Sequence, residues 1–527
     1  MQSQYPQGNR KCGIYNFITV EIKRTGEKET HPICASISPV FIFGRRNKMT
    51  YDVAVVGAGV IGGMLCRELS KYRLSVALLE KENDVAMGAS RANSGIVHGG
   101  YDPVPGTLKA KLNSEGVELL FEAAAELNVP IVRNGSMVCA FSAEEEPLIH
   151  ELYEQGQQNQ IPGLKILSGD EARNIEPNLS AAVTKVLHVT NAGIVCPYDL
   201  TISAIGNAMD NGVELYRNFK VNSIVKENGL FTVTAENGNQ IQTKYLVNCA
   251  GGYSDEIARL AGDDFFTVIP RAGEYMLLDK AEGCRVSHTL FQCPTVEGKG
   301  ILVSPTADGN LLVGPTAKVV ATPDSDDTTL AGLAEVERLA AKSVPTVNFR
   351  QVITSFSGVR ASTKGGEFIL KASENVPGLV HAGGIDSPGL TCCVSIAKYL
   401  TNILQNIGLA LNEKGNWNGK REDAHAFRKM SDEEKNEYIQ KNPSYGKIVC
   451  RCETVTEGEI LHAIRSNPPA WDIDGVKRRT RSGMGRCQGG FCGPYVMELI
   501  AQERNIPMEQ VTKFGGNSHM VIGKIGE

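Results

Sequence analysis

The sequence has no long hydrophobic run, because nowhere in its 527 residues do about 20 uncharged apolar residues follow one another. The sequence therefore predicts no transmembrane helix. A positive charge excess is also missing, since 54 Lys and Arg stand against 59 Asp and Glu and leave a net charge of −5. A strong sequence-independent hold on nucleic acid is therefore not expected. The N-terminus lacks the apolar segment and cleavage site of a secretory signal.

The cysteines lack the spacing of a disulfide scaffold. Of the 14 cysteines, most are scattered, and four form a cluster near the C-terminus. This usage favours a reducing compartment with one cysteine-based site, so we expect a cytoplasmic protein. Neighbouring residues rarely form an unstrained disulfide, and the adjacent Cys392 and Cys393 are therefore expected to fill a core.

The length and composition are those of a multidomain globular protein. At ~150 residues per domain the chain has room for roughly two to four domains, and 42% hydrophobic residues supply their cores. We expect residues 1–48 to be an N-terminal extension, for which a misassigned start codon is the preferred explanation. Residues 49–411 alternate strand-like and helix-like runs. Residues 412–445 form a charged linker with one short helix, and residues 446–527 form a small domain.

A dinucleotide-binding motif opens the large body. The apolar residues 51–56 predict a buried parallel strand, which leads into a glycine-rich turn and a helix. A second apolar strand, residues 75–79, ends in Glu80, which is placed to bind ribose hydroxyls. The turn allows a pyrophosphate to approach the N–H groups at the helix N-terminus. Its glycines are Gly57, Gly59 and Gly62. This motif predicts a dinucleotide site but does not separate FAD from NAD.

Five further segments follow in a characteristic order. They are GASRANSGIVHGGY (88–101), LVNCAG (246–251), PRAGEY (270–275), SGVR (357–360) and AGGIDSPGL (382–390). Together they resemble FAD-dependent oxidoreductases of the D-amino-acid-oxidase/glycerol-3-phosphate-dehydrogenase type, over about residues 50–405. The resemblance implies an α/β fold, with a Rossmann-like FAD-binding domain interleaved with a mixed-sheet substrate domain. The substrate portions are expected at about 130–200 and 260–350. The FAD contacts that it implies beyond the first turn and Glu80 are Ser90, Ser94, Gly95, Ala250, Gly251, Gly384, Asp386, Gly389 and Leu390.

Four cysteines near the C-terminus form two close pairs, Cys450 with Cys452 and Cys487 with Cys492. A C-x-C pair is too tight for the common zinc knuckle, so [2Fe–2S] ligation is favoured over zinc or free buried thiols. Capping-box spacings predict one helix in the linker and one after the first cysteine pair. These spacings are Ser431 with Glu434 and Thr456 with Glu459.

The C-terminal segment as a whole resembles the [2Fe–2S]-binding domain of the bacterioferritin-associated ferredoxin type. This resemblance implies a small α-rich domain that uses all four cysteines as ligands. Its fusion behind a flavin body is similar to the layout of the large subunits of anaerobic glycerol-3-phosphate dehydrogenases.

Two side chains are the leading candidates for the chemistry. His98, in the segment implied to face the flavin, is a candidate base or electrophile, and a packed structural histidine is the alternative. Arg360 is a candidate anchor for a phosphate or carboxylate, because its planar fork binds either group bidentately. Secondary candidates are Arg271 and Lys364, which are equally well explained as surface charges, and Tyr101 and Tyr275, which line the pocket or fill a core.

These observations imply an FAD-dependent dehydrogenase that oxidises sn-glycerol 3-phosphate to dihydroxyacetone phosphate. Electrons would pass through a [2Fe–2S] centre to an acceptor protein or a second flavoprotein subunit, and membrane association would need such a partner. Residues 93–110 also resemble L-2-hydroxyglutarate dehydrogenases, which leaves a 2-hydroxy acid as an alternative substrate. Amine or imino-acid oxidation and a non-catalytic electron-transfer scaffold are further alternatives.

Overall fold

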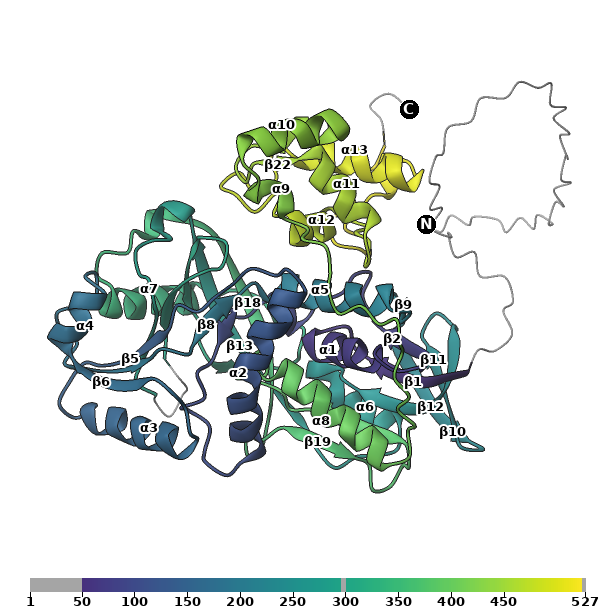
Figure 1. Ribbon diagram of the computed structural model, residues 1–527, viewed down its shortest axis with the longest axis horizontal. Helices are drawn as coiled ribbons and strands as arrows, with labels where there is room; N and C mark the ends of the chain where they lie inside the picture. The colour runs from purple at the N-terminus through teal and green to yellow at the C-terminus, as the bar shows by residue number, and fades with distance from the viewer. Residues whose placement is uncertain (1–49, 295–299, 524–527) are drawn as a thin grey trace, which may run out of the picture. The chain divides into compact units, whose positions relative to one another are not determined.

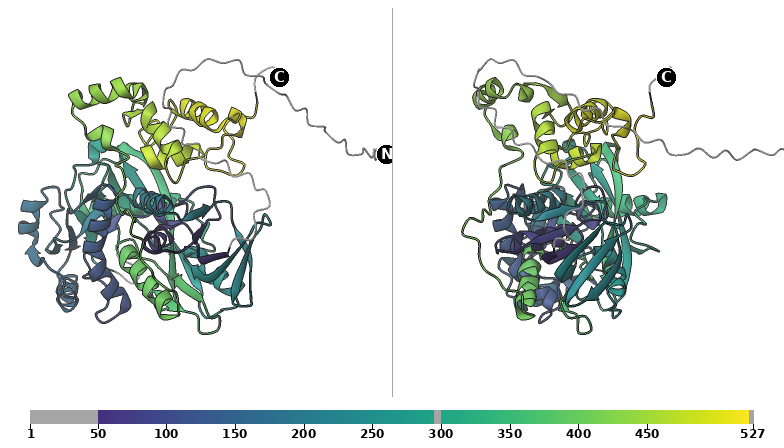
Figure 2. Two further views of the ribbon diagram at one scale, coloured as in Figure 1. Left: turned by 45° about the vertical axis from the view of Figure 1, so that its right-hand side comes forward. Right: turned by 90° about the vertical axis from the view of Figure 1, so that its right-hand side faces the viewer.

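A computed structural model describes residues 50–294 and 300–523. The predicted extension, residues 1–48, lies outside these ranges. The described residues belong to one unit, in which two large sheets lie side by side and carry a group of C-terminal helices (Figures 1 and 2). Within these ranges no helix combines the length and the apolarity needed to cross a bilayer.

The first sheet has a parallel centre. Its parallel strands are, in spatial order, β9 (Glu214–Tyr216), β2 (Val76–Leu79), β1 (Thr50–Val56), β12 (Gln240–Asn248) and β20 (Leu379–Gly383). Strands β10 (Val221–Glu227), β11 (Leu230–Ala235) and β19 (Ile369–Ala372) are antiparallel to their neighbours. Val53 and Val55 enter one hydrophobic core and Ala54 and Val56 enter another. Both faces of β1 are therefore covered, which explains its continuous apolar run.

Helices cover both faces of this sheet. The core on one face includes α1 (Val60–Leu69), α2 (Leu108–Glu126), α5 (Pro197–Asp210) and α8 (Cys393–Asn406). The core on the other face includes α6 (Ser254–Leu260). A small sheet of β3 (Ile96–Val97), β8 (Gly193–Val195) and β4 (Ile131–Val132) links this body to the second large sheet.

The second sheet is mixed. Its strands are, in spatial order, β17 (Lys318–Val319), β13 (Val268–Leu278), β16 (Leu311–Gly314), β15 (Leu302–Pro305), β14 (Thr289–Gln292), β5 (Ser136–Ala140), β7 (Lys185–Val189) and β6 (Leu164–Ser168). Strand β18 (Val352–Thr363) pairs along the whole of β13, so this sheet includes residues beyond the expected substrate portion at about 260–350. Helices α4 (Gly169–Ile175) and α7 (Leu330–Ser343) pack on one face and α3 (Glu146–Gln158) packs on the other.

The C-terminal segment has its own hydrophobic core. Its elements are α9 (Ala426–Lys429), α10 (Asp432–Lys441), β21 (Ile448–Cys450), β22 (Val455–Thr456), α11 (Glu457–Arg465), α12 (Ile473–Thr480) and α13 (Gly493–Arg504). Capping boxes open α10 and α11 at the predicted residues. Pro494 occupies the first turn of α13, as its missing N–H allows.

The segment predicted as a linker is bound to the body along much of its length. Trp417 Nε1 donates to Ser70 Oγ at 3.1 Å. Arg421 Nη1 donates to the carbonyl of Ile202 at 3.2 Å, and His425 Nε2 lies 3.1 Å from Asp199 Oδ2. Polar composition suggested a free connection, but these contacts hold residues 413–425 on the surface formed by α1 and α5.

Candidate functional site

The glycine turn after β1 has no room for side chains. Gly57 has φ +105°, and a Cβ there would lie 2.4 Å from the carbonyl oxygen of Cys249. A Cβ on Gly62 would lie 2.0 Å from the carbonyl oxygen of Gly57. Helix α1 has Gly59 as its N-cap, a residue with no side chain of its own to cap the helix. The turn therefore presents backbone N–H groups at a helix N-terminus, and this fits the pyrophosphate of a dinucleotide.

Ser90 and Glu80 lie beside this turn. Ser90 Oγ accepts a hydrogen bond from the N–H of Val60 at 2.9 Å. Glu80 follows β2 directly, and its carboxylate accepts from the N–H of Ala58 at 2.8 Å and of Glu82 at 2.9 Å. Burial raises the pKa of Glu80. Both side chains thus lie at the C-terminal ends of β1 and β2, beside the glycine turn.

A second turn lies at the same edge of the sheet. The N–H of Cys249 donates to the carbonyl of Val56 at 2.9 Å, which holds the end of β12 beside the end of β1. Ala250 and Gly251 follow directly, and the N–H of Ala250 donates to Asn248 Oδ1 at 3.3 Å. The two predicted dinucleotide-contact turns are therefore neighbours in space.

The predicted flavin-proximal segment contacts the small sheet and the second large sheet. The N–H of Val195 donates to the carbonyl of Gly95 at 2.7 Å. Ser94 Oγ lies 3.4 Å from the hydroxyl of Tyr275 on β13. The Tyr275 ring stacks on Phe356 of β18, with 4.9 Å between ring centroids. Tyr275 therefore forms part of a wall that faces this segment.

His98 lies between the closing loop, residues 382–390, and the second sheet. Its N–H donates to Thr391 Oγ1 at 2.8 Å, and its Nε2 lies 3.2 Å from Ser387 Oγ. Its ring stacks against Phe291 of β14, with 5.7 Å between ring centroids. These contacts fix the orientation of the imidazole where the closing loop and the flavin-proximal segment meet.

The closing loop is anchored by Asp386. Its carboxylate forms an ion pair with Lys109 Nζ at 2.9 Å and accepts a hydrogen bond from Ser362 Oγ at 3.0 Å. The N–H of Gly389 donates to the carbonyl of Asp386 at 2.6 Å. The neighbouring predicted contacts Gly384 and Leu390 lie in the same loop. The side chain of Asp386 therefore shapes the loop, and the backbone remains the part of it that suits a flavin contact.

Arg271 and Arg360 are directly opposite each other on the paired strands β13 and β18. Like charges in such cross-strand positions repel, so an anion bound between them would stabilise the pair. Arg360 Nη1 donates to the carbonyl of Thr316 at 3.3 Å. This arrangement suits a phosphate or a carboxylate. Lys364 is exposed, whereas Tyr101 is buried in a hydrophobic core.

The four C-terminal cysteines lie in two pairs. The Sγ atoms of Cys452 and Cys487 are 3.8 Å apart. A hydrogen bond from the Cys492 thiol lowers the pKa of Cys450. Within the described ranges, no three His, Cys, Asp or Glu side chains converge on one point as a single metal ion would require. Two thiol pairs instead fit the two irons of a [2Fe–2S] cluster, each with two cysteines.

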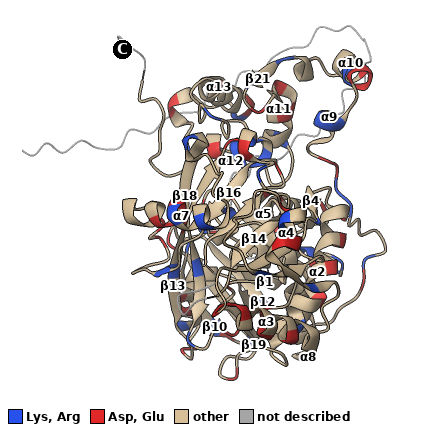
Figure 3. Ribbon diagram, turned by 90° about the vertical axis from the view of Figure 1, so that its left-hand side faces the viewer, with Lys and Arg blue, Asp and Glu red and all other residues tan. Residues whose placement is uncertain are grey.

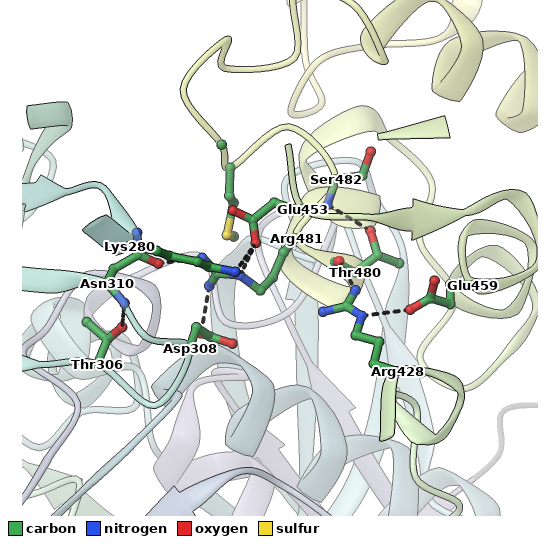
Figure 4. Close-up of polar contacts among 12 residues, drawn as sticks. Lys280, Thr306, Asp308, Asn310, Arg428, Glu453, Glu459, Thr480, Arg481 and Ser482 are labelled. Carbon is green, nitrogen blue, oxygen red and sulfur yellow. Dashed lines mark hydrogen bonds and ion pairs between the residues drawn. The ribbon is translucent and has the colours of Figure 1, made fainter. Parts of the chain in front are cut away.

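Arg481, just after α12, joins the cysteine segment to the second sheet (Figure 4). Its guanidinium lies 2.9 Å from Glu453 Oε2 and 2.6 Å from Asp308 Oδ2, and it donates to Asn310 Oδ1 at 2.8 Å. Lys280 Nζ also pairs with Glu453, at 3.0 Å. Since Glu453 directly follows Cys452, this network fixes the first cysteine pair relative to the body.

A buried carboxylate forms a second junction that sequence reasoning missed. Asp84, which follows β2, pairs with Arg478 at 2.6 Å and with Arg479 at 2.7 Å. Burial would raise the pKa of Asp84, but the two guanidinium groups hold it far below the usual 3.8. Figure 3 shows basic residues on α12, which carries both arginines. The one sequence signal was the run of basic residues 477–481, whose partner lies almost 400 positions away.

Replacing Asp84 with asparagine should lower the free energy of unfolding by about 3–5 kcal/mol, because two buried guanidinium groups lose their counter-charge. Since the pKa of Asp84 is depressed in the folded protein, its stabilisation is complete above the unfolded pKa near 3.8 and decreases as the pH falls below it. Urea unfolding followed by tryptophan fluorescence, at neutral pH and at pH about 3, measures both effects. The exposed Asp264→Asn is the matched control, and equal stability of the two variants would contradict the prediction.

A cavity of about 250 Å³ is lined by residues of the body and of the cysteine segment. Ser94, Gly95 and Phe356 line it from the body, and Met484 and Gln488 line it from the cysteine segment. Tyr198 also borders the cavity, and its hydroxyl donates to Met484 Sδ at 3.5 Å. The flavin-proximal segment and the segment around Cys487 therefore face the same space.

Two family models match the chain. The model described as FAD dependent oxidoreductase matches residues 52–403, and the model described as BFD-like [2Fe-2S] binding domain matches residues 448–502. Neither match alone names a substrate.

Among individual proteins, a glycerol 3-phosphate dehydrogenase of Caloramator mitchellensis is 44% identical over 473 residues, which cover 90% of this chain and 98% of that protein. The solved structure of the L-alpha-glycerophosphate oxidase of Mycoplasma pneumoniae with FAD bound is 33% identical, with a TM-score of 0.68. The match covers 71% of this chain and 98% of the oxidase chain. The mitochondrial L-2-hydroxyglutarate dehydrogenase of Homo sapiens is 30% identical over 292 residues, covering 52% of this chain and 63% of that protein.

Proposed function

The chain belongs to the family of FAD-dependent oxidoreductases, and we propose that it oxidises sn-glycerol 3-phosphate to dihydroxyacetone phosphate. It is an FAD-dependent dehydrogenase with a C-terminal [2Fe–2S] domain. The proposal rests on the 44% identity to a glycerol 3-phosphate dehydrogenase across almost the whole of both chains. The paired arginines of β13 and β18 supply an anion site that suits this substrate.

The FAD site would be formed by residues from three regions of the chain. The turns at 57–62 and 250–251 would hold the pyrophosphate and the adenosine half, with Glu80 beside the ribose. The flavin would lie against residues 94–98 and the backbone of the closing loop. When bound, FAD takes up a hydride, and the cluster passes electrons on singly.

The protein side chains would orient the substrate and accept its proton. We assign the phosphate to Arg360 and Arg271, because these two cationic residues are cross-strand partners on β13 and β18. We assign the hydroxyl proton to the His98 imidazole, because its backbone and ring are held by Thr391 and Phe291. Oxidation of the alcohol then removes one hydride from carbon and one proton from oxygen. Tyr275 would close one wall of the pocket and exclude water.

Replacing His98 with alanine should lower kcat by about 10²–10⁴-fold, as expected for loss of a general base. FAD content should be unchanged, because the glycine turns are untouched. Anaerobic stopped-flow measurement of flavin bleaching by glycerol 3-phosphate reports this step directly. The exposed His150→Ala serves as the control. Wild-type bleaching by the His98→Ala protein would show that another group accepts the proton.

A second candidate substrate is L-2-hydroxyglutarate, since the human enzyme is 30% identical over 292 residues and an arginine pair also binds carboxylates. Anaerobic addition of each compound to the purified protein separates the two. Bleaching by glycerol 3-phosphate alone supports the proposal, and bleaching by the hydroxy acid alone replaces the substrate. If neither reacts while dithionite reduces both centres, amines become the next candidates.

We also propose that the electrons leave through an acceptor protein or a second flavoprotein subunit, in the cytoplasm. The cluster domain suits one-electron transfer to a partner. Every cysteine in the described ranges is free of disulfide bonds, as a reducing compartment favours. No nucleic-acid partner is proposed, since the net charge is −5.

A further inference from the structure

One edge of the cysteine site faces solvent. Cys452 is exposed and Cys487 is partly exposed, whereas Cys450 and Cys492 are buried. The exposed pair is held together, with 3.8 Å between its sulfur atoms. If the four thiols hold a cluster, this pair binds the iron nearer to solvent. An electron therefore has its shortest way out of the domain at this edge.

Phe491 is the most prominent apolar side chain beside that edge. It lies in the loop from Cys487 to Cys492, and its side chain is 88% exposed. The glycines at 489 and 490 precede it and offer no cover. An exposed phenylalanine next to a redox site suits an anchor for a docked protein, because buried aromatic anchors dominate interface energies.

The charge beside this edge is positive. Arg451, between the first two cysteines, is exposed and makes no hydrogen bond or ion pair within the described part of the chain. Arg486, directly before Cys487, is also exposed and lies 3.3 Å from Asp279 Oδ2. The neighbouring acid Glu453 is buried and neutralised by Arg481. Arg451 therefore has no carboxylate partner among the described residues, and its exposed positive charge favours an acidic partner.

We propose that Arg451, Cys452, Arg486, Cys487 and Phe491, here called the exit surface, dock an acidic protein that carries one electron. The proposal rests on the proposed relay of electrons through the cluster. Each substrate molecule yields two electrons and two protons. Two carrier molecules take up one electron each, and the protons pass to solvent. The cations steer the carrier to the surface, and Phe491 anchors it.

Two model acceptors of opposite charge test the exit surface. Plastocyanin is acidic and cytochrome c is basic, and both accept one electron with a visible colour change. The holoenzyme is reduced with dithionite, desalted and mixed with either acceptor in a stopped-flow instrument. The rate with plastocyanin should fall as salt is added. Arg451→Glu should lower it by about tenfold at low salt and raise the cytochrome c rate. Phe491→Ala should lower the plastocyanin rate by about fivefold.

Binding without electron transfer gives an independent measurement. Calorimetry with both proteins oxidised should show a higher Kd for plastocyanin in Arg451→Glu than in the wild type. Visible absorbance checks that each variant keeps its cluster. If Arg451→Glu loses its cluster, Arg451→Gln takes its place. The controls are Lys398→Glu, exposed on α8 of the body, and Phe514→Ala, whose side chain is 50% exposed. Both controls should match the wild type.

Unchanged plastocyanin rates in Arg451→Glu and Phe491→Ala would overturn the exit surface. A difference in oligomeric state between these variants and the wild type on sedimentation would also overturn it, because the surface would then bind a second copy of the chain. The proposed function is tested separately by adding glycerol 3-phosphate in place of dithionite. If only dithionite-reduced enzyme shows the expected pattern, the substrate assignment fails and the exit surface stands. If glycerol 3-phosphate reduces both centres but the variants equal the wild type, the exit surface alone fails.

Discussion

Replacing Arg360 with alanine should lower kcat/KM for glycerol 3-phosphate by about 10³-fold. A bidentate guanidinium–phosphate contact contains two charge-assisted hydrogen bonds, and together they account for about 4 kcal/mol. Arg271, on the neighbouring strand, would keep its contact with the anion and would hold it less firmly than both arginines together. Steady-state kinetics with a dye acceptor measures the effect, and the flavin spectrum should stay unchanged.

Lysine at position 360 distinguishes charge from geometry. Because lysine keeps the charge but loses the planar fork, Arg360→Lys should recover only part of the activity. The control is Arg338→Ala, an exposed arginine of α7. If Arg360→Ala and Arg338→Ala have the same kcat/KM, the phosphate binds elsewhere.

Replacing Cys452 with serine should remove the cluster and leave the flavin reaction intact. Loss of even an outer-shell partner costs metal sites 10–100-fold in affinity, so loss of a thiolate should cost about a hundredfold or more. Glycerol 3-phosphate should still bleach the flavin of this variant at the wild-type rate. Reduction of a one-electron acceptor should fall by about the same hundredfold.

The measurement combines iron content, visible absorbance and acceptor reduction on one preparation. Cys284→Ser is the matched control, because Cys284 is an exposed cysteine without a disulfide that lies outside the C-terminal segment. Retention of the full iron–sulfur spectrum by Cys452→Ser would refute the assignment of this residue as a ligand. Loss of flavin bleaching as well would show that the two centres are not separable by this change.

Local sequence signals were sufficient where the governing contacts are short in range. One such region is the strand at 51–56 with its glycine turn and with Glu80, which ends the neighbouring strand. All three lie within 30 residues of one another, and backbone geometry dictates each of them. The capping boxes at Ser431 and Thr456 were found at the predicted positions for the same reason, since a cap involves residues only three apart. The four cysteines stood out because each lies close in sequence to another, but their pairing in space, Cys452 with Cys487 and Cys450 with Cys492, came only from the structure.

Contacts between distant segments were beyond sequence reasoning. The position of Tyr275 on the wall facing Ser94, and the burial of Tyr101 in a core, depend on how two sheets meet. The pairing of β18 with β13, across about 85 residues of chain, also could not be read from local pattern. A polar composition likewise concealed the contacts that hold residues 413–425 against the body.

The sequence by itself determined the cofactor chemistry of this protein, because glycine turns and cysteine spacings act through the local backbone. Only the tertiary structure decided how those parts are joined. The cross-strand pairing of Arg271 with Arg360 depends on strand register, and the union of Asp84 with Arg478 and Arg479 depends on packing between segments almost 400 residues apart. Electrostatic pairing of buried groups is set by distance in space, which periodicity and spacing along the chain do not encode.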